Sequence, residues 1–189
     1  IGKLGLNPLI TTLGMMQAAR GLVLVQTEGT PISLRGAAQS FSNLGGGEIF
    51  GIPSMVFIWL AIVVIADYLM RNSSMLRKVF YVGSNEEAAM LSGINVTKVK
   101  IGVYIFTALL AGIAGILTAS RFGMAAATTG KGEELKVIAS AVIGGASLNG
   151  GAGTVYGSVL GVILFGLINN ALVLLDIPVF YQSMITGLI

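Results

Sequence analysis

Residues 154–175 read TVYGSVLGVILFGLINNALVLL and contain no charged residue. At a rise of 1.5 Å per residue, a helix of this length is about 33 Å long. That length is enough to cross the hydrocarbon core of a bilayer, which is about 30 Å thick. The stretch therefore predicts a transmembrane helix.

The composition of the whole chain indicates the same class. Of the 189 residues, 54% are hydrophobic and only 10% are charged, and the mean hydropathy is +0.89. Soluble domains carry about 25% charged residues, so a soluble protein of this size could not cover its surface with so few. The net charge of +3 comes without a basic cluster interleaved with aromatic residues, which argues against nucleic acid as a partner.

Two residue types are missing from the sequence, and this narrows the chemistry. With no Cys there is no disulfide, thiolate nucleophile or Cys-ligated metal. With no His, the commonest general base and zinc ligand is missing as well. The eight carboxylates are mostly scattered, and no two are placed as an acid–base pair. We therefore expect no catalytic residue, no metal and no cofactor on this chain.

The apolar runs predict an all-α, polytopic membrane protein with a single transmembrane domain over 1–189. The expected spans lie at 8–27, 53–70, 99–120, 135–148 and 154–175, and an apolar stub follows at 182–189. The run at 135–148 is short for a full crossing, so either a full span or a broken helix fits it. The chain begins at Ile1 rather than Met, and the stub would reach only about 12 Å as a helix. We therefore expect a fragment that lacks both ends of a longer membrane protein.

Orientation follows from the basic residues of the short loops, because loops rich in Lys and Arg stay in the cytoplasm. The most basic part of the chain is the segment 71–98 and its flank, with Arg71, Arg77, Lys78, Lys98 and Lys100. The 28–52 loop contains only Arg35, and the 121–134 loop contains Arg121 and Lys131. We therefore expect 71–98 in the cytoplasm and the loops at 28–52, 121–134 and 176–181 outside.

The basic segment contains a polar stretch, VGSNEEAAMLSGINV at 82–96, between apolar runs. Ser84 and Glu87 have the S-x-x-E spacing of a capping box, and Gly93 is suited to a left-handed helix stop. The pattern predicts a helix of about two turns with Ala88 and Leu91 on one side. Because a helix this short is not stable alone in water, it must dock on its own membrane domain or on another protein. A plain interfacial linker helix is the alternative.

This stretch and a second one resemble a known family. Gly83–Val96, GSNEEAAMLSGINV, is similar to the cytoplasmic loop of ribose-type sugar ABC importer permeases. Glu134–Gly153, ELKVIASAVIGGASLNGGAG, resembles the second signature of the same family. Leu167–Leu172 and Tyr181–Gln182 also fit, so the resemblance runs along nearly the whole chain and keeps its order.

The resemblance implies partners as well as a fold. Permeases of this type pair with a second permease copy in the bacterial inner or plasma membrane, as homo- or heterodimers. They receive sugar from an extracytoplasmic sugar-binding protein and are driven by ATP-binding ABC subunits, which hydrolyse the ATP. By resemblance, the helix that couples to the ATPase comprises Asn85, Glu86, Glu87, Ala88, Ala89, Leu91, Ser92 and Gly93.

Glycines and amides supply a second set of candidate residues. Gly153, Gly157 and Gly161 recur every four residues, a spacing that lets helices pack closely in lipid. A further cluster lies at and before a turn: Gly144, Gly145, Asn149, Gly150 and Gly151. Because glycine permits unusual backbone angles at helix breaks, this cluster forms either a gate on the translocation path or only a tight hairpin. Asn169 and Asn170 lie in an apolar helix, where an amide bonds either a neighbouring helix or a hydroxyl-rich substrate.

We interpret the sequence as part of the permease subunit of an ATP-driven importer that moves a monosaccharide by alternating access. A branched-chain amino-acid permease has the same architecture, but no obvious buried charge is present to meet its zwitterionic substrate. A passive channel or facilitator would not require a capped docking helix. A purely structural subunit would tolerate loss of the glycines at 144–153.

Overall fold

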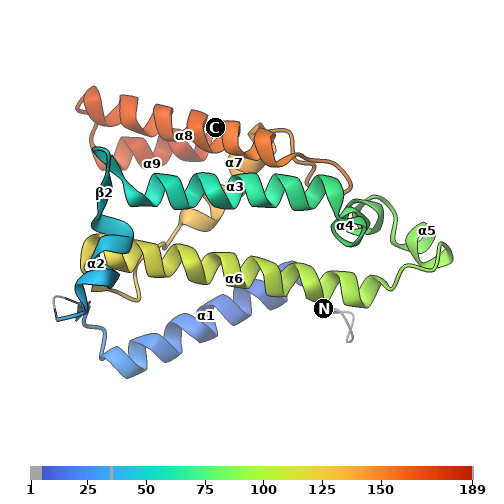
Figure 1. Cartoon of the computed structure of the whole chain (residues 1–189), viewed down its shortest axis with the longest axis horizontal. Helices are drawn as coiled ribbons and strands as arrows, with labels where there is room; N and C mark the ends of the chain where they lie inside the picture. The colour runs from blue at the N-terminus through green and yellow to red at the C-terminus, as the bar shows by residue number, and fades with distance from the viewer. Residues whose placement is uncertain (1–5, 35, 189) are drawn as a thin grey trace. The chain divides into compact units, whose positions relative to one another are not determined.

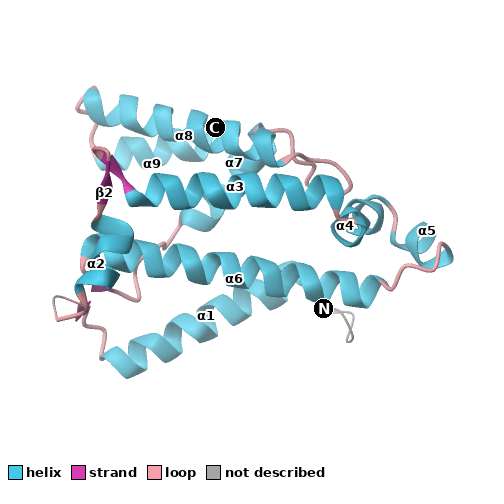
Figure 2. Cartoon of the chain, in the orientation of Figure 1, coloured by secondary structure: helices cyan, strands magenta, loops and turns pink. Residues whose placement is uncertain are grey.

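The computed structural model describes residues 6–34 and 36–188, and within them the chain is mostly helical (Figure 1, Figure 2). Arg35 and Ile189, the last residue of the apolar stub, lie outside the described residues. The chain divides into two compact units. One comprises Ile1–Ile62 and Ala89–Thr129, and the other comprises Val63–Ala88 and Gly130–Ile189.

The first unit begins with helix α1, Pro8–Thr27. The side chain of Asn7 caps it by accepting a hydrogen bond from the backbone N–H of Leu9 at 3.0 Å, and Pro8 occupies the first turn, where no N–H is needed. The helix ends at Glu28, which has a left-handed backbone. None of the residues of α1 is buried, as expected for a helix that faces lipid.

Helix α2, Gln39–Gly46, packs on the C-terminal part of α6, Val96–Phe122 (Figure 1). Ser120 of α6 holds this contact, because its hydroxyl accepts from the N–H of Gly45 at 2.8 Å and donates to the carbonyl of Phe41 at 2.6 Å. A Cβ added at Gly45 would lie 2.6 Å from the carbonyl oxygen of Leu117, so the two backbones touch. A buried serine thus serves as the polar centre of this unit.

Four strands of two residues each connect the helices of the first unit. β1, Ile32–Ser33, pairs antiparallel with β4, Met124–Ala125. β2, Glu48–Ile49, pairs with β3, Ile52–Pro53, across a turn at Phe50 and Gly51 in which both residues have positive φ. These short pairs fix loops and do not alter the helical class.

Helix α3, Ser54–Asn72, follows directly, and the Ser54 hydroxyl donates to the carbonyl of Leu44 at 2.7 Å. After one residue, Ser73, the chain forms α4, Ser74–Ser84. The sequence pattern predicts a cytoplasmic loop at 71–98, so α4 is a helix that the prediction missed. The helix was missed because basic residues interrupt its apolar positions, and the prediction relied on long apolar runs.

The second unit contains α7, Glu133–Ile143, and α8, Val155–Leu174, which pack side by side (Figure 1). Glycines make the contact: a Cβ at Gly157 would overlap the carbonyl of Gly144, and one at Gly161 would overlap the carbonyl of Ser140. Gly153, predicted to stack on the same helix face, instead precedes α8, whose N-cap is Thr154. That part of the prediction is wrong, because the run of glycines begins in the loop.

The run at 135–148 does not form one helix, since α7 stops at Ile143 after 11 residues. A helix of 11 residues is only about 16 Å long, too short to cross a bilayer unaided. The stop comes from Gly144 and Gly145, and Gly145 has a φ of +90°. The run therefore forms a short helix and a loop, and whether this part of the chain is a broken span stays a prediction. Helix α9, Val179–Leu188, begins earlier than the predicted stub.

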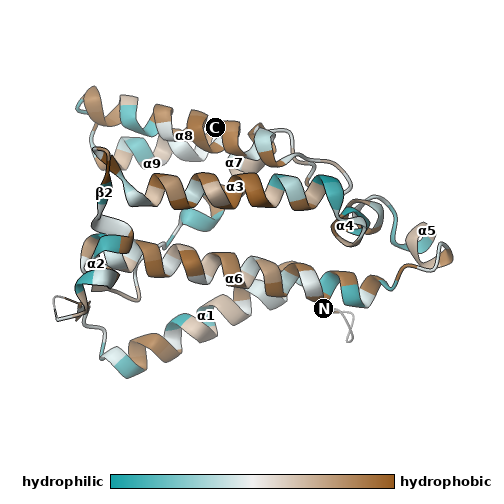
Figure 3. Ribbon diagram, viewed as in Figure 1, coloured by the Kyte–Doolittle hydropathy of each residue, from teal (hydrophilic) through white to brown (hydrophobic). Residues whose placement is uncertain are grey.

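Within the described residues, four helices are long and apolar enough to cross a membrane: α1, α3, α6 and α8. Figure 3 shows long hydrophobic stretches on α3, α6 and α8. Many large apolar side chains on these helices are exposed, including Leu22, Val64, Leu109 and Leu160. Such surfaces are stable only against lipid or other membrane helices. The prediction of an all-α, polytopic membrane protein is confirmed.

Candidate functional site

The predicted docking helix exists as α5, Glu86–Leu91. Its cap differs from the prediction. Ser84 is the last residue of α4, so it does not form a capping box with Glu87. The carboxamide of Asn85 takes that place, and its Oδ1 accepts from the N–H of Ala88 at 3.0 Å. Ser84 and Asn85 are adjacent and both suit a helix cap. Because α4 extends to Ser84, Asn85 caps α5.

The stop of α5 follows the prediction. Gly93 has a φ of +78°, the left-handed conformation that glycine adopts readily. Its N–H donates to the carbonyl of Met90 at 2.9 Å, and the N–H of Ile94 donates to the carbonyl of Ala89 at 3.0 Å. These two bonds form a Schellman motif, so the structure defines both ends of α5.

We name Asn85–Gly93 the coupling segment. Its side chains are largely exposed: Leu91 is 90% exposed and Met90 is 56% exposed. Ala88, Glu86, Glu87 and Ser92 are exposed as well, whereas Ala89 is only 4% exposed. A short polar helix thus exposes two apolar side chains, Met90 and Leu91, outside the long membrane helices.

The predicted glycine cluster divides into a helix stop and a loop tip. At the stop, Gly145 donates to the carbonyl of Val142 at 2.9 Å and Ala146 donates to the carbonyl of Ala141 at 2.9 Å, which is a second Schellman motif. Gly144 lies against Gly157 of α8. This part of the cluster ends α7 and packs it on α8.

The loop tip comprises Asn149, Gly150 and Gly151. Gly150 and Gly151 have φ of +86° and +76°, and both lie against the C-terminal end of α4, at Gly83 and Ser84. The structure therefore brings the second signature of the sequence against the residue that precedes the coupling segment. No feature of the sequence predicted this contact.

Asn169 and Asn170 lie differently on α8. Asn169 is half-buried, and its Nδ2 donates to the carbonyl of Phe165 in the same helix at 3.0 Å, not to another helix. It lines a cavity of about 590 Å³ together with Lys136, Gln182 and Thr186 from α7 and α9. Asn170 is exposed and does not line that cavity. The cavity offers donors and acceptors of the kind that a hydroxyl-rich molecule bonds.

An ion pair in α3 has no counterpart among the predicted site residues. Asp67, only 8% exposed as a residue, accepts from Nε of Arg71 at 2.8 Å. The Arg71 guanidinium also lies 5.5 Å from the ring centre of Tyr156 in α8. The pair borders a cavity of about 520 Å³ that also touches Thr154 and Ser158. Its i,i+4 spacing is a signal that the sequence offered.

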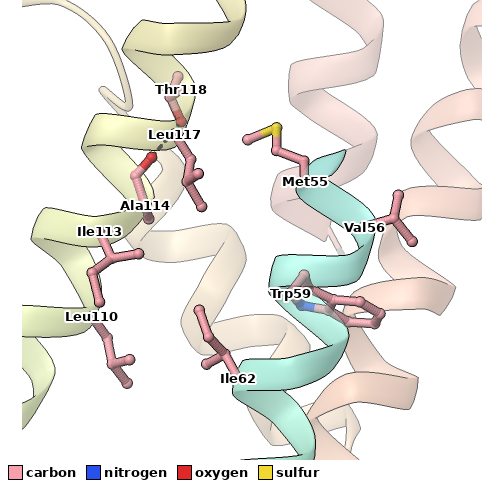
Figure 4. A pocket seen from close by; sticks show the side chains of 9 residues that line it. All are labelled: Met55, Val56, Trp59, Ile62, Leu110, Ile113, Ala114, Leu117 and Thr118. Atoms are coloured by element: carbon pink, nitrogen blue, oxygen red, sulfur yellow. Dashed lines mark hydrogen bonds between the residues drawn. The ribbon is translucent and has the colours of Figure 1, made fainter. Parts of the chain in front are cut away.

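A third cavity, of about 470 Å³, lies between α6 and the first turns of α3. Figure 4 shows Met55 and Ile62 of α3 and Leu110 and Leu117 of α6 pointing into it. The hydroxyl of Thr118 donates to the carbonyl of Ala114 in its own helix at 2.7 Å. The lining is almost entirely apolar, which suits lipid or another helix better than a polar substrate.

Among residues 6–34 and 36–188, no group of three or more His, Cys, Asp or Glu side chains is placed to hold a metal ion. The family described as branched-chain amino acid transport system, permease component, matches residues 1–189, the full length of the chain. The chain belongs to this permease family. With four helices able to span a bilayer, it is a multi-pass membrane protein of the inner or plasma membrane.

Members of the family named for sugars are similar to the chain along its whole length. The ribose import permease protein RbsC of Bacillus subtilis is 39% identical over 189 residues, and that of Haemophilus influenzae is 37% identical over 191. The L-arabinose transport system permease protein AraH of Escherichia coli is 38% identical over 189 residues. These alignments cover 100% of this chain but 59%, 59% and 57% of the relatives. No solved structure matches the chain significantly.

Family membership confirms the resemblance to sugar ABC importer permeases that the two signatures indicated. The chain spans somewhat more than half of the length of the relatives named above. The roles of the coupling segment, of the glycine cluster and of Asn169 and Asn170 stay predictions, and they enter the proposals below.

Proposed function

We propose that the chain is part of the permease subunit of an ATP-driven ABC importer for a monosaccharide. The observation that carries the proposal is α5: a helix of six residues, capped by Asn85, stopped by Gly93 and exposing Leu91. A helix so short needs a partner to be stable. The partner that fits a permease of this family is an ATP-binding ABC subunit.

The side of the membrane supports the same partner. Basic residues cluster in and around 71–98, which places the coupling segment in the cytoplasm by the positive-inside rule. ATP is held there, and subunits that hydrolyse it dock from that side. The sugar would arrive from the other side, delivered by an extracytoplasmic binding protein to the surface formed by the 28–52, 121–134 and 176–181 loops.

The substrate class follows from the relatives and from the charges in the chain. The family description mentions branched-chain amino acids, but the relatives named above transport ribose or L-arabinose by their names. A zwitterionic amino acid would need a charge within the membrane to bind. Among the described residues, the buried carboxylate of Asp67 pairs with Arg71. Lys136, which lines the cavity beside Asn169, pairs with Glu133. These two charges already have partners, which supports a neutral, hydroxyl-rich substrate.

The mechanism is alternating access, with the chemistry on other chains. ATP binding closes the two ATPase subunits, the docked coupling segments follow, and the permease helices move as rigid bodies between two arrangements. Sugar passes along the interface of two permease copies, and the polar cavity beside Asn169 supplies hydrogen bonds for its hydroxyl groups. This chain contributes no catalytic residue and no cofactor.

The docking assignment is tested by a charge on the exposed face of α5. Leu91→Arg should weaken the association of the ATP-binding subunit and abolish ATP-driven uptake of ribose and L-arabinose by the reconstituted transporter. Leu175→Arg is the matched control, because Leu175 is also exposed, at 71%, but caps the end of α8. It should leave association unchanged.

Full uptake by the Leu91→Arg transporter would refute docking through α5. Uptake by the wild-type transporter that proceeds without ATP would instead favour a passive facilitator, and ATP-driven uptake of leucine or valine but not of sugars would favour the amino-acid alternative.

A further inference from the structure

The loop between α7 and α8 touches the end of α4 through the backbones of Gly83, Gly150 and Gly151 and through the side chain of Ser84. A Cβ added at Gly83 would lie 2.6 Å from the backbone nitrogen of Gly151, and one added at Gly150 would lie 2.6 Å from the carbonyl oxygen of Gly83. A Cβ at Gly151 would overlap the Ser84 hydroxyl. Real Cβ atoms essentially never approach other atoms within 3.0 Å, so no side chain fits. We name Gly83, Gly150 and Gly151 the glycine contact.

The loop side of the glycine contact is held in one shape. The N–H of Ser147 donates to the carbonyl of Ala152 at 2.9 Å, and the N–H of Gly150 donates back to the carbonyl of Ser147 at 3.1 Å. Gly150 and Gly151 adopt left-handed conformations that other residues reach only with strain. The loop tip is therefore a stiff turn.

The same loop is joined closely to two membrane helices. Its first residues form the Schellman stop of α7 at Gly145. Before this stop, α7 and α8 touch through Gly144 against Gly157 and through Ser140 against Gly161. These contacts hold the α7 and α8 backbones directly against each other, and the loop joins the two helices covalently. A force on the loop tip thus acts on α7 and α8 together.

The other side of the glycine contact leads directly into the coupling segment. Ser84 ends α4, and the next residue, Asn85, caps α5. The N–H of Asn85 also donates to the carbonyl of Tyr81 at 3.2 Å, which completes the last turn of α4. Asn85 therefore belongs to both helix ends, and a displacement of α5 pulls or pushes the end of α4.

We propose that the glycine contact transmits the movement of the coupling segment to the α7–α8 pair. The proposal rests on the proposed function, in which an ATPase moves the coupling segment. It makes Gly83, Gly150 and Gly151 positioning residues that link the docking helix to a helix pair beside the polar cavity of Asn169. Gly150 and Gly151, for which the sequence left a gate and a tight hairpin open, would then transmit force between two helical elements. Coupling between distant sites is carried by packed elements that touch both sides, and the glycine contact lies between the coupling segment and the α7–α8 pair.

Gly83→Ala tests the role of the glycine contact in the complete transporter, reconstituted in vesicles with its ATP-binding and sugar-binding partners. Gly83 lies inside α4, where alanine is the better helix former, so the variant alters the contact and not the helix. We expect the ATPase subunit to bind and hydrolyse ATP as before, while the amount of ribose or L-arabinose imported per ATP falls about tenfold, equivalent to ~1.4 kcal/mol of coupling. Gly102→Ala in α6, where a Cβ would meet nothing within 4 Å, should keep the wild-type ratio.

An unchanged ratio of uptake to ATP hydrolysis in Gly83→Ala would refute transmission through the glycine contact but not the proposed function. A wild-type transporter without ATP-driven uptake would refute the proposed function itself. If Gly83→Ala fails to assemble, a second experiment decides. In a double variant with Ser84→Cys and Asn149→Cys, bridging the two thiols with a short bifunctional reagent should preserve uptake, because the two sides move as one. Loss of uptake on bridging, with each single-cysteine variant active, would mean that the two sides must separate and would overturn the proposal.

Discussion

The cap of α5 gives a sharp prediction for the coupling segment. Asn85→Ala removes the 3.0 Å hydrogen bond from the N–H of Ala88. Loss of such a cap costs about 1 kcal/mol of helix stability, and α5 has six residues with which to offset it. Since about 1.4 kcal/mol is tenfold in an equilibrium constant, the ordered fraction of α5 falls by up to about fivefold.

The measurement is the affinity of the purified ATP-binding subunit for the permease in lipid nanodiscs. If the ATPase binds only ordered α5, its Kd rises by the same factor, up to about fivefold. Asn85→Asp is the control, because aspartate caps helices as well as asparagine and favours the positive end of the helix dipole; its Kd should stay at the wild-type value. An unchanged Kd for Asn85→Ala would refute the reasoning. An aspartate variant as weak as the alanine variant would show that the amide contacts the ATPase directly.

Three further predictions concern the membrane helices. Asn169→Leu should lower ATP-driven sugar uptake about tenfold, because one hydrogen bond in the cavity beside Asn169 is lost. Asn170→Leu, outside that cavity, should leave uptake unchanged. Equal effects of the two variants on uptake into vesicles would show that Asn169 does not contact the sugar. Gly161→Ala should destabilise the protein by about 1–3 kcal/mol through overpacking against α7. Gly166→Ala, in open space on the same helix, should leave the melting temperature in detergent unchanged. A larger loss of stability in Gly166→Ala than in Gly161→Ala would contradict the α7–α8 contact. Ser120→Ala leaves a buried N–H without its acceptor and should destabilise the first unit by about 1–3 kcal/mol, a loss that thermal unfolding would detect and that a wild-type Tm would exclude.

The helical class and the positions of four long helices follow from sequence because hydropathy decides them. A run such as 154–175 has no other stable arrangement in lipid than a helix, since every backbone group must be bonded within it. The observed α1 and α8 begin and end within a residue of the expected spans. A local feature is also predictable where one residue determines it, as Gly93 determines the end of α5.

Prediction failed where two local signals compete or where the decisive partner is distant in sequence. Ser84 and Asn85 both suit a helix cap, and only the extension of α4 settles which one acts. The glycines at 144–145 were visible, but apolar residues beyond them extended the expected helix to 148. The contact of Gly83 with Gly150 and Gly151 joins segments far apart in the chain, and glycine leaves no hydrophobic pattern from which such a contact could be inferred.

The central claim, that α5 is the surface on which the ATPase acts, is tested most directly by site-specific photo-cross-linking in intact cells. A photoreactive amino acid at position 91, where Leu91 is 90% exposed, is predicted to capture the ATP-binding ABC subunit. The same amino acid at position 180, where Phe180 is 87% exposed in the first turn of α9, should not. Capture of the ATPase from position 180 but not from position 91 would contradict the account.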